Sequence, residues 1–239
     1  MATVTPTSRI LSPPAIESYL VAMARSVERS INSALDALLA RDEQGASAVF
    51  LLEPRINEME IVIDDRAVRL LREGGLGEGD LRHIVATIKI NNDLERMGDL
   101  AVNIGQRVIA LAQMPRVASP AELDPMCATV RSMVGRSLGA LIYRNLTLAH
   151  EVLESEEEVD SYRDRAFDRL MSAIRDDASL AGPHVQFLLA TRHLERIADH
   201  TTNIVEDVVF WLRGLDIRHG RAGAGPADTP VPPTPDQDL

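Results

Sequence analysis

One segment of the chain is written twice, 100 residues apart, and this repetition constrains the fold more than any other feature. Glu95–Asp99 (Glu-Arg-Met-Gly-Asp) returns as Glu195–Asp199 (Glu-Arg-Ile-Ala-Asp). Each copy is followed four residues later by an asparagine, Asn103 or Asn203, and then by an isoleucine. A chain of 239 residues is long enough to form two similar halves. We therefore interpret the sequence as a tandem duplication.

Apolar residues recur every three or four positions along most of the chain, which is the pattern of helices that pack in a bundle. In the first predicted helix this stripe contains Ile16, Leu20, Met23, Val27, Ile31, Leu35 and Leu38. No segment shows the alternation of a run of strands. The pattern predicts an all-α protein built from two tandem, pseudo-symmetric three-helix bundles. The six helices are expected at about 15–41, 46–72, 81–114, 120–144, 147–176 and 183–213.

Local signals mark several helix ends. Ser12 before two prolines is typical of a helix start, Ser119–Glu122 resembles a capping box, and Gly214 should end the last helix. Pro54 falls inside the second predicted helix and should kink it or delay its start. The resulting division is an N-terminal extension (1–14), a first bundle (15–116), a second bundle (117–215) and a Pro/Gly-rich tail (216–239) with the composition of a disordered segment.

Composition excludes several classes of function. The formal net charge of -11 and the isoelectric point near 5.0 disfavour direct binding to nucleic acid or to anionic lipid. The single cysteine, Cys127, excludes an intrachain disulfide framework and is expected in the core. Without an export signal or an apolar run of roughly 18 to 20 residues, we expect a cytoplasmic protein that reaches a membrane only through partners.

The duplicated acids are candidate ligands for a cation. Positions four apart on a helix lie along one face, so each motif places two carboxylates together, where they repel unless a cation lies between them. At 100° per residue the acids point away from the apolar seam that begins at Met97 and Ile197, and we expect them to be exposed. The same 100-residue offset relates a second set of pairs, Glu60 with Asp64 and Asp160 with Asp164.

An antiparallel arrangement of the helices brings these pairs together. The second and third helices are joined by a short turn, so residues at equal distance from it lie side by side. This predicts one patch of four carboxylates in each half, with an asparagine one turn further. The candidate ligands are Glu60, Asp64, Glu95 and Asp99 in the first half and Asp160, Asp164, Glu195 and Asp199 in the second, with Asn103 and Asn203 as additional candidates. Oxygen ligands suit iron, manganese, magnesium or calcium, and zinc also binds carboxylates.

Two other interpretations compete with a metal site. The acids could form a solvated helix face in which Arg96 and Arg196 make local ion pairs, although chance does not readily produce four pairs that obey both symmetries. A carboxylate-bridged di-iron enzyme or an iron-storage bundle would need Glu-x-x-His pairs and acids that point into the core. No motif helix carries Glu-x-x-His after Glu95 or Glu195. His193 and His200 are not duplicated, and we expect them at the surface.

The chain resembles the PhoU family of phosphate-transport regulators, most specifically at Leu94–Ile104 and Leu194–Ile204. The resemblance covers about residues 15 to 214. It implies an all-helical, non-enzymatic, homodimeric protein with iron or zinc clusters, or other divalent ions such as Mg or Mn, at surface pairs of the E/D-x-x-x-D type. It also implies a role that links the ATPase subunit of a phosphate ABC importer to a sensor histidine kinase and represses phosphate-starvation genes.

Overall fold

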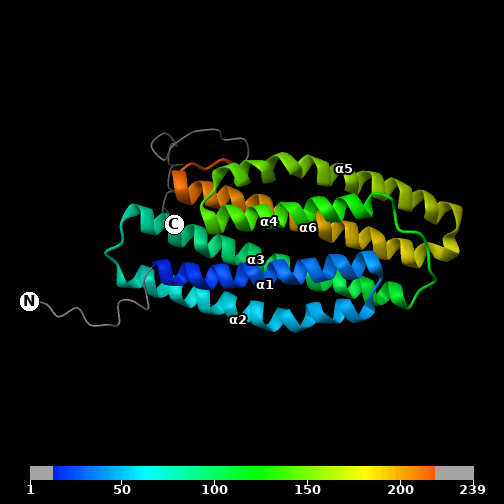
Figure 1. Ribbon diagram of the computed structural model, residues 1–239, viewed down its shortest axis with the longest axis horizontal. Coiled ribbons are helices and arrows are strands. Elements are labelled where there is room, and N and C mark those ends of the chain that lie inside the picture. The colour runs from blue at the N-terminus through cyan, green and yellow to red at the C-terminus, as the bar shows by residue number, and fades with distance from the viewer. Residues whose placement is uncertain (1–12, 219–239) are drawn as a thin grey trace, which may run out of the picture.

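The computed structural model describes residues 13–218, which form six α-helices and one short 3-10 helix (Figure 1). The predicted all-α class is confirmed. Ser12, most of the N-terminal extension and the tail from residue 219 lie outside the described residues. The elements are α1 (Pro13–Ala40), α2 (Glu43–Glu73), α3 (Glu78–Ala112), α4 (Leu123–Tyr143), α5 (Leu146–Asp176), η2 (Ala178–Leu180) and α6 (Ala181–Arg213).

The helices form two layers that correspond to the two halves of the sequence. In Figure 1, α1 and α2 lie along one side of an elongated molecule and α4 and α5 along the other, with α3 and α6 between them. The most extensive contact between the halves is that of α3 with α6. These two helices run antiparallel, because Lys89 contacts Asp207 while Arg107, further along α3, contacts Gln186 near the start of α6.

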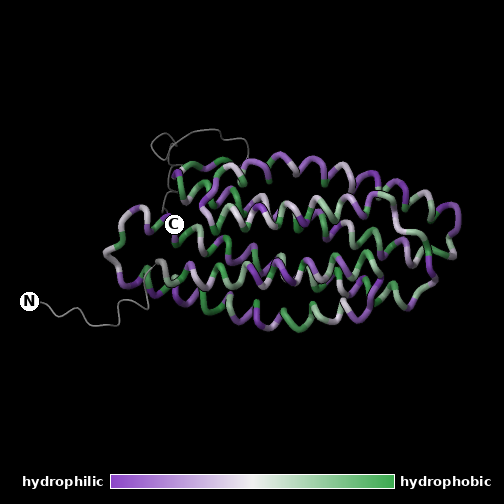
Figure 2. The backbone as a smooth tube through the Cα atoms, viewed as in Figure 1, coloured by the Kyte–Doolittle hydropathy of each residue, from purple (hydrophilic) through white to green (hydrophobic). Residues whose placement is uncertain are grey.

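A single apolar core extends through both halves. The predicted seam residues of α3 and α6 are buried, with side chains such as Met97, Ile104, Ile197 and Ile204 fully inaccessible to solvent. Figure 2 shows hydrophobic and hydrophilic residues alternating along each helix, as expected for amphipathic helices that pack on one side. The aromatic ring of Trp211 is only partly buried and stacks on His83 with a centroid separation of 4.2 Å.

Two predicted helix starts were wrong. Helix α2 begins at Glu43, eleven residues before Pro54, where the Asp42 side chain caps it by accepting a hydrogen bond from the Gln44 amide. Pro54 is exposed within the helix and does not delay its start. The predicted capping box at Ser119–Glu122 is not formed, because α4 starts only at Leu123. Glu122 instead accepts hydrogen bonds from an arginine of α5, Arg169, with Nε and Nη2 each 2.9 Å from a carboxylate oxygen.

Other local predictions were confirmed. Gly214 ends α6 in the left-handed conformation with φ of 68°, where a side chain would be strained. Cys127 is a buried core residue, and burial raises the pKa of its thiol to about 12. Across residues 13–218, none of the helices combines the length and apolar character that a membrane span requires.

Equivalent positions in the two repeats are not separated by one constant number of residues. Buried positions of α3 recur in α6 after 100 residues: Ile84 and His184, Leu94 and Leu194, and Val108 and Val208 are three such pairs. In α2 and α5 the offset is 103, because Ala46, Val49, Ile56, Ile63 and Ala67 correspond in burial to Ala149, Val152, Val159, Ala166 and Leu170. The spacing from Ala67 to Ile84 is three residues longer than that from Leu170 to His184, so the offset changes in the connection between α5 and α6.

The shared core predicts how unequally two leucines contribute to stability. Leu94 is fully buried on α3, so Leu94→Ala should lower the free energy of unfolding by about 2 to 5 kcal/mol. Leu51 on α2 is 80% exposed, and Leu51→Ala should change it by no more than about 0.5 kcal/mol. Urea denaturation followed by circular dichroism measures both. Similar losses for the two variants would contradict the assigned core.

Candidate functional site

The four acids predicted for the first half do come together, on the outer side of α2 and α3. We call Glu60, Asp64, Glu95 and Asp99 the first acidic patch. Partial burial raises the pKa of Glu60, the charges of Asp64 and Asp99 raise it further, and Arg96 partly opposes them. Burial likewise raises the pKa of Glu95, followed by the charge of Asp99. The carboxylates are thus close enough to disfavour each other's ionisation.

The expected exposure of the acids was only partly right. The Asp99 side chain is 39% exposed, but that of Glu95 is 14% exposed because α2 packs over this side of α3. Glu95 Oε2 is buried and accepts no hydrogen bond, although Arg96 Nε lies 3.3 Å away. Asn91 donates to Asp64 Oδ1 at 2.9 Å. The first acidic patch therefore combines mutual repulsion with a buried carboxylate oxygen that accepts no hydrogen bond.

The second half carries a different set of acids from the one predicted. Burial and then the charges of Glu195 and Asp160 raise the pKa of Asp199. Burial and then Asp199 and Asp160 raise the pKa of Glu156. We call Glu156, Asp160, Glu195 and Asp199 the second acidic patch. Glu156 and Asp160 form an i,i+4 pair of their own, which is the signal that could have identified Glu156 from the sequence.

The predicted equivalence of Asp160 and Asp164 with Glu60 and Asp64 was wrong. Because the offset between α2 and α5 is 103, the structural counterparts of Glu60 and Asp64 are Arg163 and Phe167. Asp164 lies at the edge of the second acidic patch and pairs with Arg163, whose Nη2 is 2.8 Å from Asp164 Oδ1.

Arg163 lies among the acids of the second half. Its guanidinium contacts a carboxylate oxygen of Glu195 and lies 3.5 Å from Asp160 Oδ1. Arg192 of α6 is 3.9 Å from the other Glu195 oxygen. In the first acidic patch, Arg96 lies 3.3 Å from Glu95 and 3.7 Å from Asp99. The two patches thus differ in the position of their cation.

Asn203 and the two histidines face the junction between the repeats. The Asn203 amide donates to Asp93 Oδ1 at 3.3 Å, and His200 Nδ1 lies 2.8 Å from the same oxygen. His193 and His200, which were expected at the surface, are partly buried. Burial, followed by the charges of Arg107 and Arg196, lowers the pKa of His193. In the part of the chain that the structure describes, Asn103 makes no hydrogen bond to the acids.

The acids provide oxygen ligands of the kind that cations bind, but their side chains are not arranged in the geometry of a metal site. Among residues 13–218, no group of three or more His, Cys, Asp or Glu side chains is positioned to hold a metal ion. The first acidic patch nevertheless offers four carboxylates, an orphaned Glu95 oxygen and two raised carboxyl pKa values, which a bound cation would correct.

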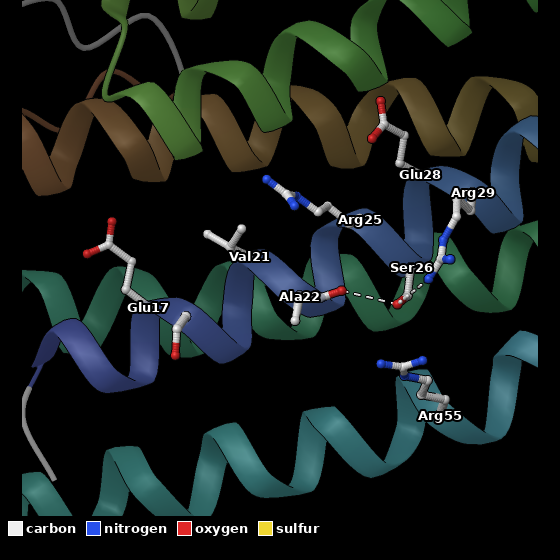
Figure 3. Close-up of a pocket in the computed structure, with 9 residues that line it drawn as sticks. Glu17, Val21, Ala22, Arg25, Ser26, Glu28, Arg29 and Arg55 are labelled. Carbon is white, nitrogen blue, oxygen red and sulfur yellow. Dashed lines mark hydrogen bonds between the residues drawn. The ribbon is translucent and has the colours of Figure 1, made fainter. Parts of the chain in front are cut away.

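A second feature is a hollow of about 860 Å³ on the surface of α1 and α2 (Figure 3). Figure 3 shows Arg29 and Arg55 approaching from the two helices on either side of Ser26, while Arg25 extends from another side of α1. We call this hollow, with Arg25, Arg29 and Arg55, the arginine groove. Within residues 13–218, none of these three arginines has a carboxylate at ion-pair distance. Glu17, at the rim, is already paired with Arg144 at 3.0 Å.

The arginine groove is absent from the second repeat. Positions in α4 follow those of α1 by 103, as Leu123, Val130 and Leu141 follow Leu20, Val27 and Leu38, and positions in α5 follow those of α2 by 103 as well. The counterparts of Arg25, Arg29 and Arg55 are therefore Ala128, Ser132 and Glu158. Thr129, the counterpart of Ser26, has its Oγ1 3.4 Å from Glu158 Oε2, so an acid takes the position of Arg55 in the second repeat. The positive groove is specific to the first half.

The fold and the surface acids define a helical tandem-repeat protein. Residues 20–108 and 123–208 each match the PhoU domain. The chain belongs to the PhoU family, whose members are phosphate-transport accessory and regulatory proteins and not enzymes. Both repeats seen in the sequence therefore correspond to a known domain, and the di-iron enzyme interpretation is not supported.

Individual relatives agree over most of their length. The chain is 34% identical over 207 residues to a phosphate-specific transport system accessory protein PhoU homolog of Pseudomonas aeruginosa, covering 85% of each. It is 33% identical over 203 residues to the homolog of Clostridium acetobutylicum, covering 84% of this chain and 93% of the relative.

Solved structures show the same fold. The crystal structure of PhoU from Pseudomonas aeruginosa superimposes with a TM-score of 0.80 at 33% identity, over 84% of this chain and 96% of that one. The phosphate transport system regulatory protein PhoU from Streptococcus pneumoniae gives 0.77 at 25% identity, over 85% and 96%.

Charge repulsion in the first acidic patch predicts a pH-dependent effect of neutralising Glu95. Its pKa in the folded protein is raised, so the cost of ionising it is absent below the unfolded value of about 4.3 and fully present above the folded value. In chelator, Glu95→Gln should therefore raise the melting temperature at pH 7, and this gain should vanish towards pH 4.

A matched control is Asp65→Asn, which removes an exposed carboxylate paired with Arg69 at 2.7 Å. It should give no gain at either pH. Thermal melts of both variants between pH 4 and 7 measure the effect. A Glu95→Gln protein that melts lower than wild type at pH 7 would show that repulsion does not dominate this patch.

Proposed function

We propose that the chain is a cytoplasmic, homodimeric regulator of phosphate uptake and of phosphate-starvation signalling. In this role it links the ATPase subunit of a phosphate ABC importer to a sensor histidine kinase and keeps starvation genes repressed when phosphate is plentiful. The observation that carries the proposal is the match of both repeats to the PhoU domain, together with relatives named for phosphate-specific transport. Contact with membrane components is then made through these protein partners.

We propose the arginine groove as the surface that meets a partner. The chain carries a net charge of -11, yet among residues 13–218 these three arginines have no carboxylate at ion-pair distance, although Glu17 and Glu28 also line the hollow. Arginine is enriched at protein interfaces, where its guanidinium pairs with carboxylates. The three side chains spread over two helices around the small residues Ala22 and Ser26, which suits an array of carboxylates on a partner more than one small anion.

The regulatory role predicts a phenotype for deletion of the gene, and the proposed groove predicts that a groove variant cannot reverse it. Deleting the gene should leave alkaline phosphatase and importer genes expressed in phosphate-rich medium, and the wild-type gene should restore repression. A variant with Arg25→Glu, Arg29→Glu and Arg55→Glu should fail to restore it, because an acidic partner would now be repelled. Alkaline phosphatase activity and co-purification of the importer ATPase subunit are the measurements.

The control introduces glutamate at Arg72 and Arg175, two exposed arginines outside the groove, and should complement fully. Unchanged repression in the deletion strain would sink the regulatory role itself. Full complementation by the triple variant would remove only the groove from the proposal.

We further propose that the first acidic patch binds a divalent or ferric cation, with iron or zinc expected from the family and Mg or Mn also compatible. Glu60, Asp64, Glu95 and Asp99 would supply oxygen ligands only, which hard and borderline cations accept. The bound ion would offset the repulsion that raises the pKa values of Glu60 and Glu95 and would cross-link α2 to α3.

Loss of one ligand should therefore reduce metal binding. Asp99→Asn should lower the metal content of protein purified without chelator or histidine tag, and should shrink the rise in melting temperature that metal gives wild type. Acidification through roughly pH 5 to 4 should release the ion, because ligands must be deprotonated. Elemental analysis and thermal melts test this, with Asp65→Asn as the control. Wild type without bound metal, and an Asp99→Asn protein that melts higher, would contradict it.

A further inference from the structure

We infer that Arg163 acts as a built-in cation in the second acidic patch, so that the second repeat excludes metal while the first repeat admits it. The inference rests on the proposed metal-binding role of the first acidic patch. It concerns which of the two patches is available and which residue decides this.

The contacts of Arg163 are those expected of a substitute for a bound ion. One guanidinium group contacts a carboxylate oxygen of Glu195, lies 2.8 Å from Asp164 Oδ1 and 3.5 Å from Asp160 Oδ1. Only 25% of the Arg163 side chain and 13% of the Glu195 side chain are exposed, so these charges are partly shielded from water. Charge-assisted hydrogen bonds of this kind are stronger than neutral ones, and arginine does not lose its proton at physiological pH.

The corresponding position in the first repeat carries the opposite charge. With the offset of 103 between α2 and α5, Arg163 corresponds to Glu60. Exchange of a carboxylate for a guanidinium changes the local charge by two units. Arg96, the arginine of the first acidic patch, lies at its exposed rim, 3.3 Å from Glu95 and 3.7 Å from Asp99. Each acidic patch has four carboxylates and one of these arginines, so the two differ in where the cation lies: Arg163 reaches from α5 to Glu195 on α6, whereas Arg96 lies beside acids of its own helix.

A metal ion could enter the second acidic patch only by displacing this guanidinium. Divalent cations need several carboxylate oxygens at once, and Arg163 already engages oxygens of Glu195 and Asp160. Entry would break these contacts and leave an arginine beside a divalent cation, where like charges repel. The second repeat should therefore bind metal weakly or not at all, although its motif Glu195–Asp199 matches that of the first.

The test is a titration of full-length, untagged protein with Mn²⁺ by isothermal calorimetry, with bound metal checked by elemental analysis. Wild type should bind at the first acidic patch alone. Arg163→Gln should open the second acidic patch and double the stoichiometry, whereas Arg163→Lys should keep it closed because the charge is retained. Glu60→Arg should weaken binding at the first acidic patch by about tenfold or more.

Arg165→Gln is the matched control, since this α5 arginine contacts Ser161 and Tyr162 and not the acids. It should bind Mn²⁺ as wild type does. A readout independent of activity is the melting temperature in chelator: Arg163→Gln should melt below wild type, because the acids lose their cation, and Mn²⁺ should raise it more than it raises wild type.

The outcomes separate this inference from the proposed metal role. Two equivalent ions on wild type, unchanged in Arg163→Gln, would overturn the inference and leave the metal role intact. A gain of metal in Arg163→Gln with none on wild type would support the function of Arg163 and remove the role of the first acidic patch. No metal on any of these proteins would overturn both.

Discussion

The antiparallel packing of α3 against α6 is the contact on which the rest of the structure depends. It joins the two repeats through fully buried side chains such as Leu94 and Leu194 and through polar pairs such as Lys89 with Asp207. Because the inner faces of both motif helices are used in this way, the acids of each motif must lie on other faces. There they meet α2 in one repeat and α5 in the other, and these neighbours determine what each motif can bind.

The helices were predictable because their signal is local and repeated. A three-to-four-residue spacing of apolar side chains located all six helices, and Gly214 ended the last one as expected. The starts that were missed depend on tertiary contacts. Glu122 has the sequence context of a capping residue, yet a bidentate contact with Arg169 on a distant part of the chain is available to it. Propensity gives way where such a contact is stronger.

Of the two acidic patches, only the first could be predicted from the sequence, because one connection differs in length between the repeats. The first acidic patch followed from helix geometry, but the second did not, because a shift of three residues in α5 is invisible to a constant offset. The sizes of side chains that pack against each other indicate the correct alignment of α2 with α5. Ile56 Cδ1 lies 3.3 Å from where a side chain on Gly98 would begin, while the second repeat has the smaller Val159 at the equivalent position of α5 and the larger Ala198 on α6. Such paired size changes could have shown that Arg163, and not Asp160, corresponds to Glu60.

The duplication has thus produced two similar frameworks with different surfaces. The first repeat combines an acidic patch whose arginine lies at the exposed rim with the arginine groove, and in the second repeat Arg163 lies among the acids. The most direct test of this asymmetry is anomalous diffraction from crystals grown with Mn²⁺. A manganese peak beside Glu60, Glu95 and Asp99, with protein density alone around Arg163, is the predicted result. Peaks of equal height in both patches, with Arg163 turned away from Glu195, would contradict it.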